Sequence, residues 1–436
     1  MNPDRQLVRA LGLRQLTAQI VNYTVGSGIF VVPAIAAAQL GTAAPLAYLA
    51  CAVIMVFVVL NFAEAGSRVT ATGGPYAYIE AGLGPYWGLL SGLLLNIAQI
   101  ASGGAIVALL GQTAARLFGL QHVVWPLLLT AALVLTLVAA NVRGVRLGAG
   151  IVEWSTAAKL LPLLFFVLVG IWFVTPSHLV IETAPSATAL ATTTGMLIFA
   201  FIGLESALMP SGEVRDAART VPLATLLALG VATALYLTVQ AVATGLLGPA
   251  LATDSVAPLA TAARTFAGSA GATLLLAGAT ISMLGWTTGA VLAAPRTLFA
   301  MARDGTLPAW LANVHPTHHT PHAAIVTFGI LVLAVSASGT FTQLMVVASL
   351  AVLAVYVLVA ISVLALRRKD VRTEREPLRL PGGPLVPVVT CALIAWVTVQ
   401  TATRKELVAF GIVWLLSLAM HARRRRHAAV HSEGTT

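Results

Sequence analysis

Long runs of apolar residues alternate along the chain with short segments that hold most of its charged residues. A helix needs about 20 apolar residues to cross the hydrocarbon core of a bilayer. The pattern therefore predicts an all-α polytopic membrane protein with about twelve transmembrane helices, which cover Leu16–Leu40, Pro45–Gly66, Tyr86–Leu117, Val123–Ala140, Ile151–Val174, Leu190–Ser211, Pro222–Leu247, Gly271–Ala302, Ala323–Val335, Phe341–Leu366, Val386–Thr401 and Leu407–Met420.

The first apolar run is interrupted in its middle by Gly26-Ser27-Gly28. Each glycine costs about 1 kcal/mol of helix stability relative to alanine. Non-helical backbone at that depth is tolerated only where protein or a watery cavity satisfies its polar groups. The interruption therefore favours either close helix packing through small residues or a broken helix whose free backbone groups bind a solute.

The sixth run has a similar interruption, because Gly203 lies at mid-span beside polar residues. Residues 16–174 and 190–366 hold five runs each, so the two interrupted helices occupy corresponding positions. Gly-interrupted helices at matching positions point to an inverted-repeat transporter and to its binding site. We therefore expect helices one and six to be broken and their breaks to meet near the middle of the membrane.

The composition excludes a soluble globular protein. Hydrophobic residues make up 58% of the 436 residues, charged residues 9%, and the mean hydropathy is +0.91, whereas soluble proteins carry roughly 25% charged residues. The net charge of +10 could indicate nucleic-acid binding, but the basic residues fall mainly in short loops and at the termini. Such a distribution is typical of membrane proteins, and no nucleic-acid partner is expected.

The basic residues also predict the orientation. With a cytoplasmic N-terminus, 20 of the 25 lysines and arginines fall in cytoplasmic segments, and the even helix count places both termini inside. Only four lie in outer loops, namely Arg116, Arg264, Arg404 and Lys405. The predicted organisation is a cytoplasmic arm (1–15), a core (16–366), a basic loop (367–385), two further helices (386–422) and a basic cytoplasmic tail (423–436).

No residues are expected to hold a metal or a cofactor. His315, His318, His319 and His322 cluster in a loop without carboxylate or cysteine partners, so a plain loop is the simpler interpretation. The glycines around Ser27 lack the third glycine and the flanking strand of a dinucleotide motif. The histidines lie in loops or at their edges, which argues against a membrane-embedded enzyme.

Four sequence blocks resemble the amino acid–polyamine–organocation (APC) superfamily of permeases. They are Gly26-Ser27-Gly28-Ile29-Phe30 with Pro33, Gly73-Gly74-Pro75-Tyr76-Ala77-Tyr78 with Gly82 and Gly84, Phe199 to Ser206 with Glu213 to Arg215 and Arg219 to Pro222, and Arg296 with Ala302 to Pro308 and Pro321. The blocks span roughly residues 15–325 in the family's order. The resemblance implies a LeuT-like fold of two inverted five-helix repeats with two extra C-terminal helices, in the plasma membrane.

The break in helix one suits the carboxylate of an amino acid, through the N–H groups of Gly26, Ser27 and Gly28 next to Ile29. By resemblance, the ammonium would face carbonyls around Thr24, Phe199 and Ile202, and Gly203 belongs to the same expected substrate site. Phe199 would close over the substrate, and Trp286 would line the pocket, although both rings could serve packing alone. Asn96 is a further candidate for the side-chain pocket. Because few charged residues lie deep in the helices, we expect a neutral amino acid, while an aromatic pocket could also hold a cation.

Lys159 is predicted inside helix five, about 12 Å from its cytoplasmic start. A charge at that depth is usually functional, and the resemblance implies that this lysine replaces a coupling sodium ion. The alternative is a lysine that extends to the inner membrane surface. Glu205 follows the break in helix six and has either a structural or a proton-coupling role. The expected function is proton-coupled uptake of neutral amino acids. The alternative is an exchanger of amino acids, or of an amino acid for an amine, which includes the case of a cationic substrate.

Overall fold

A computed structural model describes residues 12–26, 28–69, 74–144, 149–181, 183–204, 214, 217–303, 305–372, 377–380 and 382–433. Within these ranges the secondary structure is helical, without a strand. The α-helices are α1 (Leu13–Thr24), α2 (Val32–Leu40), α3 (Ala44–Arg68), α4 (Pro75–Leu83), α5 (Pro85–Leu117), α6 (Val124–Val142), α7 (Ala149–Gly170), α8 (Ala187–Phe201), α9 (Ala217–Leu247), α10 (Pro258–Arg303), α11 (His322–Ser338), α12 (Phe341–Arg368), α13 (Leu385–Thr401) and α14 (Arg404–Glu433).

The helices confirm the prediction of an all-α polytopic membrane protein. Each of the twelve predicted ranges overlaps a described helix, or the pair α1 and α2 in the case of the first range. Seven described segments are long and apolar enough to cross a membrane, and four shorter apolar helices accompany them. Among the short helices, α8 ends at the second break, and α11 and α13 have 17 residues each.

Several boundaries differ from the predicted ones. Helix α10 begins at Pro258 instead of Gly271, and Gly268 bends it with φ 60° and ψ −151°, so that 258–267 forms a separate arm. Helix α11 extends to Ser338, three residues beyond the predicted end. Helix α4 was absent from the predicted set because its nine residues are too few to span a bilayer. Residues 205–211, the expected end of the sixth helix, lie outside the described part of the chain.

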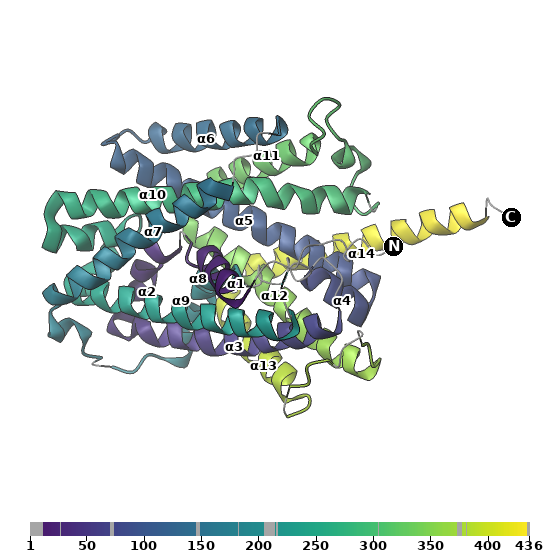
Figure 1. Ribbon diagram of the computed structural model, residues 1–436, viewed down its shortest axis with the longest axis horizontal. Coiled ribbons are helices and arrows are strands. Elements are labelled where there is room, and N and C mark those ends of the chain that lie inside the picture. Colours follow the sequence, from purple (N-terminus) through teal and green to yellow (C-terminus); the bar gives the residue numbers. More distant parts are fainter. Residues whose placement is uncertain are drawn as a thin grey trace.

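The interrupted helices lie at the centre of the bundle (Figure 1). Helix α1 packs along α9, α2 packs against α8, and α3 lies beside both α8 and α9. Helix α10 passes on the other side of α1 and packs against α5 and α7. Helix α14 extends away from the bundle toward the C-terminus. This arrangement places the ends of α1 and α8, where the helices stop, inside protein.

A buried carboxylate joins the ends of α3 and α12. Glu64 has no exposed side-chain surface, and its oxygens accept hydrogen bonds from Arg68 at 3.0 Å and from the Arg367 Nε at 2.7 Å. The backbone N–H of Leu380 donates to the same carboxylate at 3.3 Å. A buried charge is stable only when it is paired in this way. The cluster therefore ties two helix ends to the segment that precedes α13.

Candidate functional site

The first helix stops where the sequence predicts a break. Helix α1 ends at Thr24, and the Gly26 N–H donates back to the Thr24 carbonyl at 2.8 Å. Residues Gly28–Phe30 form one 3-10 turn before α2 begins at Val32. Pro33 fits the first turn of α2 because the N–H that it lacks has no partner within a helix there. The carbonyl end of α1 thus faces the N–H end of α2 across a short irregular segment, of which Ser27 lies outside the described residues.

The second break follows α8. Helix α8 ends at Phe201, and Ile202 is extended with φ −60° and ψ 132°. Gly203 has φ 116°, a conformation that side chains with a Cβ rarely adopt. Glu205, the second predicted proton-coupling residue, lies outside the described part of the chain.

The structure brings the two breaks into contact. A Cβ on Gly203 would lie 3.0 Å from the Tyr23 carbonyl oxygen, and a Cβ on Gly28 would lie 3.5 Å from the Ala200 Cα. The close approach of Gly203 to α1 therefore requires the absence of a side chain. The two glycines named from the sequence are the points at which the broken helices touch.

Tyr236 of α9 links both breaks, although the sequence pattern did not single it out. Its hydroxyl lies 2.8 Å from the Thr24 carbonyl oxygen and 2.8 Å from the Ala200 carbonyl oxygen. The side chain is fully buried, and its ring packs edge-on against Phe201 at 5.2 Å between centroids. Tyr236 and Gln240, polar residues one turn apart within an apolar run, are the signal that could have identified it.

Lys159 of α7 reaches the same region. Its Nζ donates to the carbonyl oxygen of Asn22, in the last turn of α1, and the side chain is only 6% exposed. The carbonyl end of a helix carries partial negative charge, which stabilises a cation there. The ammonium group is therefore directed at the broken helix and not at the membrane surface.

Two of the predicted aromatic residues lie at the break in the first helix. Phe199 is nearly buried, packs edge-on against Phe341 at 5.7 Å, and has its Cδ1 3.5 Å from the position of a Gly28 Cβ. The Trp286 Cδ1 lies 3.9 Å from the position of a Gly26 Cβ. Both rings are thus within contact distance of the irregular segment, and Ile29 beside them is fully buried.

Asn96 makes different contacts. Its amide donates to the Gly92 carbonyl at 2.8 Å and to the Met301 sulfur at 3.3 Å. Met301 lies fifteen residues after Trp286 in α10, about 22 Å along a helix. The described contacts of Asn96 are therefore at another level of the bundle, and its role in binding substrate stays a prediction.

Among the described residues at the first break, Thr24 has an unsatisfied hydroxyl group. The residue is 2% exposed, and no described group hydrogen-bonds to its Oγ1. An unpartnered buried hydroxyl costs free energy unless a ligand or water completes its hydrogen bonds. Thr24 therefore marks a position where a polar ligand group would be stabilised.

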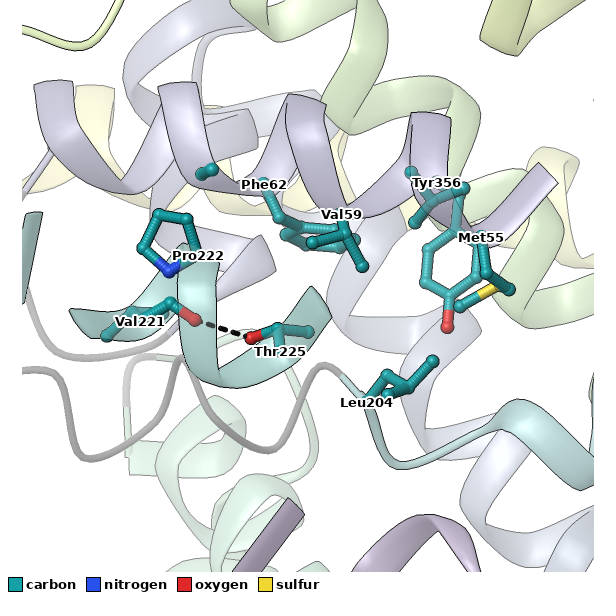
Figure 2. A pocket seen from close by; sticks show the side chains of 10 residues that line it. Met55, Val59, Phe62, Leu204, Val221, Pro222, Thr225 and Tyr356 are labelled. Carbon is teal, nitrogen blue, oxygen red and sulfur yellow. Dashed lines mark hydrogen bonds between the residues drawn. The ribbon is translucent and has the colours of Figure 1, made fainter. Parts of the chain in front are cut away.

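A small pocket next to the second break has a different character (Figure 2). Met55, Val59 and Phe62 of α3 face Leu204, which directly follows Gly203, and Tyr356 of α12 closes one end. The hydroxyl of Thr225 on α9 donates a hydrogen bond within its own helix, to the Val221 carbonyl oxygen at 2.8 Å. The lining is mainly apolar, so this pocket does not suit the charged groups of an amino acid.

The described architecture is that of an all-α membrane protein with two interrupted helices in contact at its centre, and its sequence matches known transporters. The chain belongs to the amino acid permease family, whose model matches residues 11–417. An uncharacterised transporter of Mycobacterium tuberculosis is 31% identical over 399 residues, with 90% of this chain and 87% of the relative covered.

Relatives from Bacillus subtilis carry functional names, and two of them are named for amino acids. A branched-chain amino acid permease is 26% identical over 444 residues, with 95% of this chain and 92% of the relative covered. A serine/threonine exchanger is 27% identical over 404 residues, with 89% and 90% covered. These matches confirm the resemblance to the APC superfamily, and the protein is a transporter and not an enzyme.

Removing the Tyr236 hydroxyl is expected to slow transport. The Tyr236→Phe variant keeps the ring but loses the hydrogen bonds to Thr24 and Ala200, at a cost of about 1–3 kcal/mol for a buried polar group. The measurement is the initial uptake rate per amount of folded protein in proteoliposomes, together with the thermal midpoint.

Tyr48→Phe is the matched control, because the Tyr48 hydroxyl is equally buried but donates to Gln240 and not to the breaks. We expect both variants to lower the thermal midpoint and only Tyr236→Phe to lower the rate strongly. Equal rates for the two variants would show that Tyr236 serves stability alone.

Proposed function

We propose that this permease is a secondary active transporter that takes up neutral amino acids together with protons, by alternating access around the two breaks. The observation that carries the proposal is the contact between the broken helices, with the Lys159 ammonium bonded to the carbonyl end of α1. Discontinuous helices that meet in this way are how transporters hold charged solutes at the middle of the membrane.

The substrate's charged groups would be held mainly by backbone. The N–H groups of Ser27 and Gly28 precede α2, and they suit the carboxylate. The Gly26 N–H, which donates to the Thr24 carbonyl here, would join them by exchanging that bond for one to the substrate. The Thr24 hydroxyl and the carbonyls of Phe199 and Ile202 suit the ammonium, because oxygen atoms accept its hydrogen bonds. Gly203 allows α8 to approach closely enough for both sets to reach one amino acid.

The substrate's side chain would be enclosed by Phe199 and Trp286, which both lie at the break. An aromatic enclosure without a charged side chain among its described residues favours a neutral side chain, and the branched-chain amino acid permease and the serine/threonine exchanger from Bacillus subtilis are named for neutral amino acids. The proposed substrate class is therefore neutral amino acids.

Lys159 would carry the coupling. When protonated, it holds the end of α1 through the Asn22 carbonyl; when it releases its proton, that charge-assisted bond weakens and α1 can move. Glu205 is proposed as a second proton-coupling residue from its position after the break in α8. The distribution of basic residues supports cytoplasmic placement of both termini, and the plasma membrane is proposed as the location from the family resemblance.

Exchange of one amino acid for another is the second candidate, supported by the relative named as a serine/threonine exchanger. The two modes differ in what drives accumulation. A symporter concentrates substrate when a proton gradient alone is imposed, whereas an exchanger requires an amino acid on the opposite side.

The test uses the purified protein in proteoliposomes. Uptake of each standard amino acid is measured with and without an inward proton gradient, and with and without unlabelled amino acid inside. We expect saturable uptake of neutral amino acids that a proton gradient drives against a concentration difference. Uptake that occurs only with internal amino acid would establish exchange, and non-saturable flux would indicate a channel.

A further inference from the structure

A second cavity, separate from the breaks, lies beyond the end of α5. Its volume is about 580 Å³. One wall is the last part of α5 and the following loop, and the opposite wall is the arm of residues 258–267 with the residues just before it. Ala272 and Leu276 of α10 also line the cavity, as do Val123 and Pro126 near the start of α6.

The two walls present matching helical faces. Gln112 and Arg116 are four residues apart in α5, and Ala260 and Arg264 are four residues apart in the arm, so each pair lies on one side of its helix. His122 and Gln121 from the loop add further polar groups to the rim. No aspartate or glutamate is among the described residues that line the cavity.

The concentration of positive charge is unusual for this end of the protein. In the proposed orientation, outer loops hold only four of the 25 basic residues. Two of these four, Arg116 and Arg264, line this single cavity. The tendency of basic residues to lie on the cytoplasmic side does not explain why Arg116 and Arg264 lie together on the outer side. Another physical reason for their position is therefore needed.

Arg116 already has a partner. Its Nη1 lies 2.9 Å from both oxygens of Asp254, which also accept the Thr261 hydroxyl at 2.7 Å and two backbone N–H groups. Burial opposes the charged form of this carboxyl, but the hydrogen bond from Thr261, those from the backbone and the charge of Arg116 outweigh it and lower the pKa of Asp254. Asp254 thus stays ionised and balances Arg116.

Arg264 has no such balance. Its side chain is exposed on the arm, three residues after Thr261, and no described carboxylate pairs with it. The cavity therefore holds one uncompensated guanidinium group, with five donors in a planar fork that matches a phosphate or a carboxylate. Gln112 and Gln121 can add amide donors to the same ligand.

The remaining lining is apolar and reaches the outside of the bundle. Leu276 and Val256 line the interior, and Val123 is 83% exposed at the edge, next to exposed apolar residues of α6. An occupant with a charged head and a hydrocarbon part would contact both kinds of surface. We propose that this cavity binds the phosphate or carboxylate of an amphiphilic anion, with Arg264 as the principal partner.

The test measures binding to the full-length protein and not transport, so its outcome is independent of the proposed function. The probes are dihexanoyl phosphatidylglycerol, dihexanoyl phosphatidylcholine and inorganic phosphate, titrated against purified protein with the thermal midpoint and calorimetry as readouts. We expect saturable binding of phosphatidylglycerol that Arg264→Gln weakens by about tenfold or more, as loss of a charge-assisted hydrogen bond requires. Arg264→Lys should retain part of the affinity.

Arg404→Gln is the matched control, because it removes an equivalent charge from a predicted outer segment that does not line the cavity. Selective binding of phosphatidylglycerol would support the proposal and identify a membrane lipid as the source of the anion, whereas inorganic phosphate binding as tightly as phosphatidylglycerol would overturn the proposal of an amphiphilic occupant. The proposal would be overturned if the native protein, Arg264→Gln and Arg404→Gln bound phosphatidylglycerol with equal affinity. It would also be overturned if phosphatidylcholine and phosphatidylglycerol bound equally and phosphate did not bind.

Discussion

Replacing Lys159 by alanine is expected to abolish accumulation of amino acid driven by a proton gradient. The ammonium group is almost completely buried and bonds to the Asn22 carbonyl in the last turn of α1. Without it, the end of the broken helix loses the one described cation that holds it, and no proton at that position can be released and rebound. The measurement is substrate accumulation in proteoliposomes with an inward proton gradient, compared with vesicles that contain no protein.

Lys369→Ala is the matched control for this variant. Lys369 also donates to a backbone carbonyl, that of Ala81 at 3.3 Å, but it is exposed and follows the end of α12. We expect Lys369→Ala to accumulate substrate normally. Lys159→Arg separates charge from proton release, since arginine stays protonated: it should fold and bind substrate but fail to accumulate it. Normal proton-driven accumulation by Lys159→Ala would remove Lys159 from the coupling mechanism.

Replacing Gly203 by alanine is expected to eliminate transport and to lower the stability of the protein. The new Cβ would lie 3.0 Å from the Tyr23 carbonyl oxygen, so α1 and α8 would have to separate at the break. The φ of 116° adds a backbone strain of about 1–3 kcal/mol for a residue with a side chain. Initial uptake rate and thermal midpoint are measured on the same preparation.

The control for Gly203→Ala is Gly41→Ala, between α2 and α3. Gly41 also has a positive φ, of 54°, but a Cβ there would meet no atom within 4 Å. It therefore carries the backbone strain without the steric contact. We expect Gly41→Ala to lose stability and keep transport. Equal transport activity in the two alanine variants would show that close contact between the breaks is not required.

The sequence was sufficient for the fold class because membrane helices obey a simple length requirement. Apolar runs located the helices, and the glycines at 26, 28 and 203 located both breaks. The bend at Gly268 and the short helix α4 were not predicted, because a single glycine leaves hydropathy almost unchanged and nine residues are too few to span a bilayer. Comparison with known permeases then confirmed the family.

The candidate site could be predicted only in part. Lys159 was identified because an isolated charge in an apolar run is conspicuous, but its partner, the Asn22 carbonyl, is a backbone atom that every residue possesses. Tyr236 was missed for a related reason, since a tyrosine in a membrane helix is ordinary until its hydroxyl is found between two helix ends. For Asn96, the sequence suggested a place in the substrate pocket, but only the structure shows that its amide donates to the Met301 sulfur.

The sequence by itself determined that the chain spans a membrane, where its helices run and which two of them are interrupted, because the bilayer imposes hydropathy and backbone rules that can be followed locally. Only the tertiary structure decided which interrupted ends meet, which carbonyls Lys159 and Tyr236 hold, and how Arg116 and Arg264 come to line one cavity. These relations join residues far apart in the chain, and they depend on how helices pack, which no local pattern encodes.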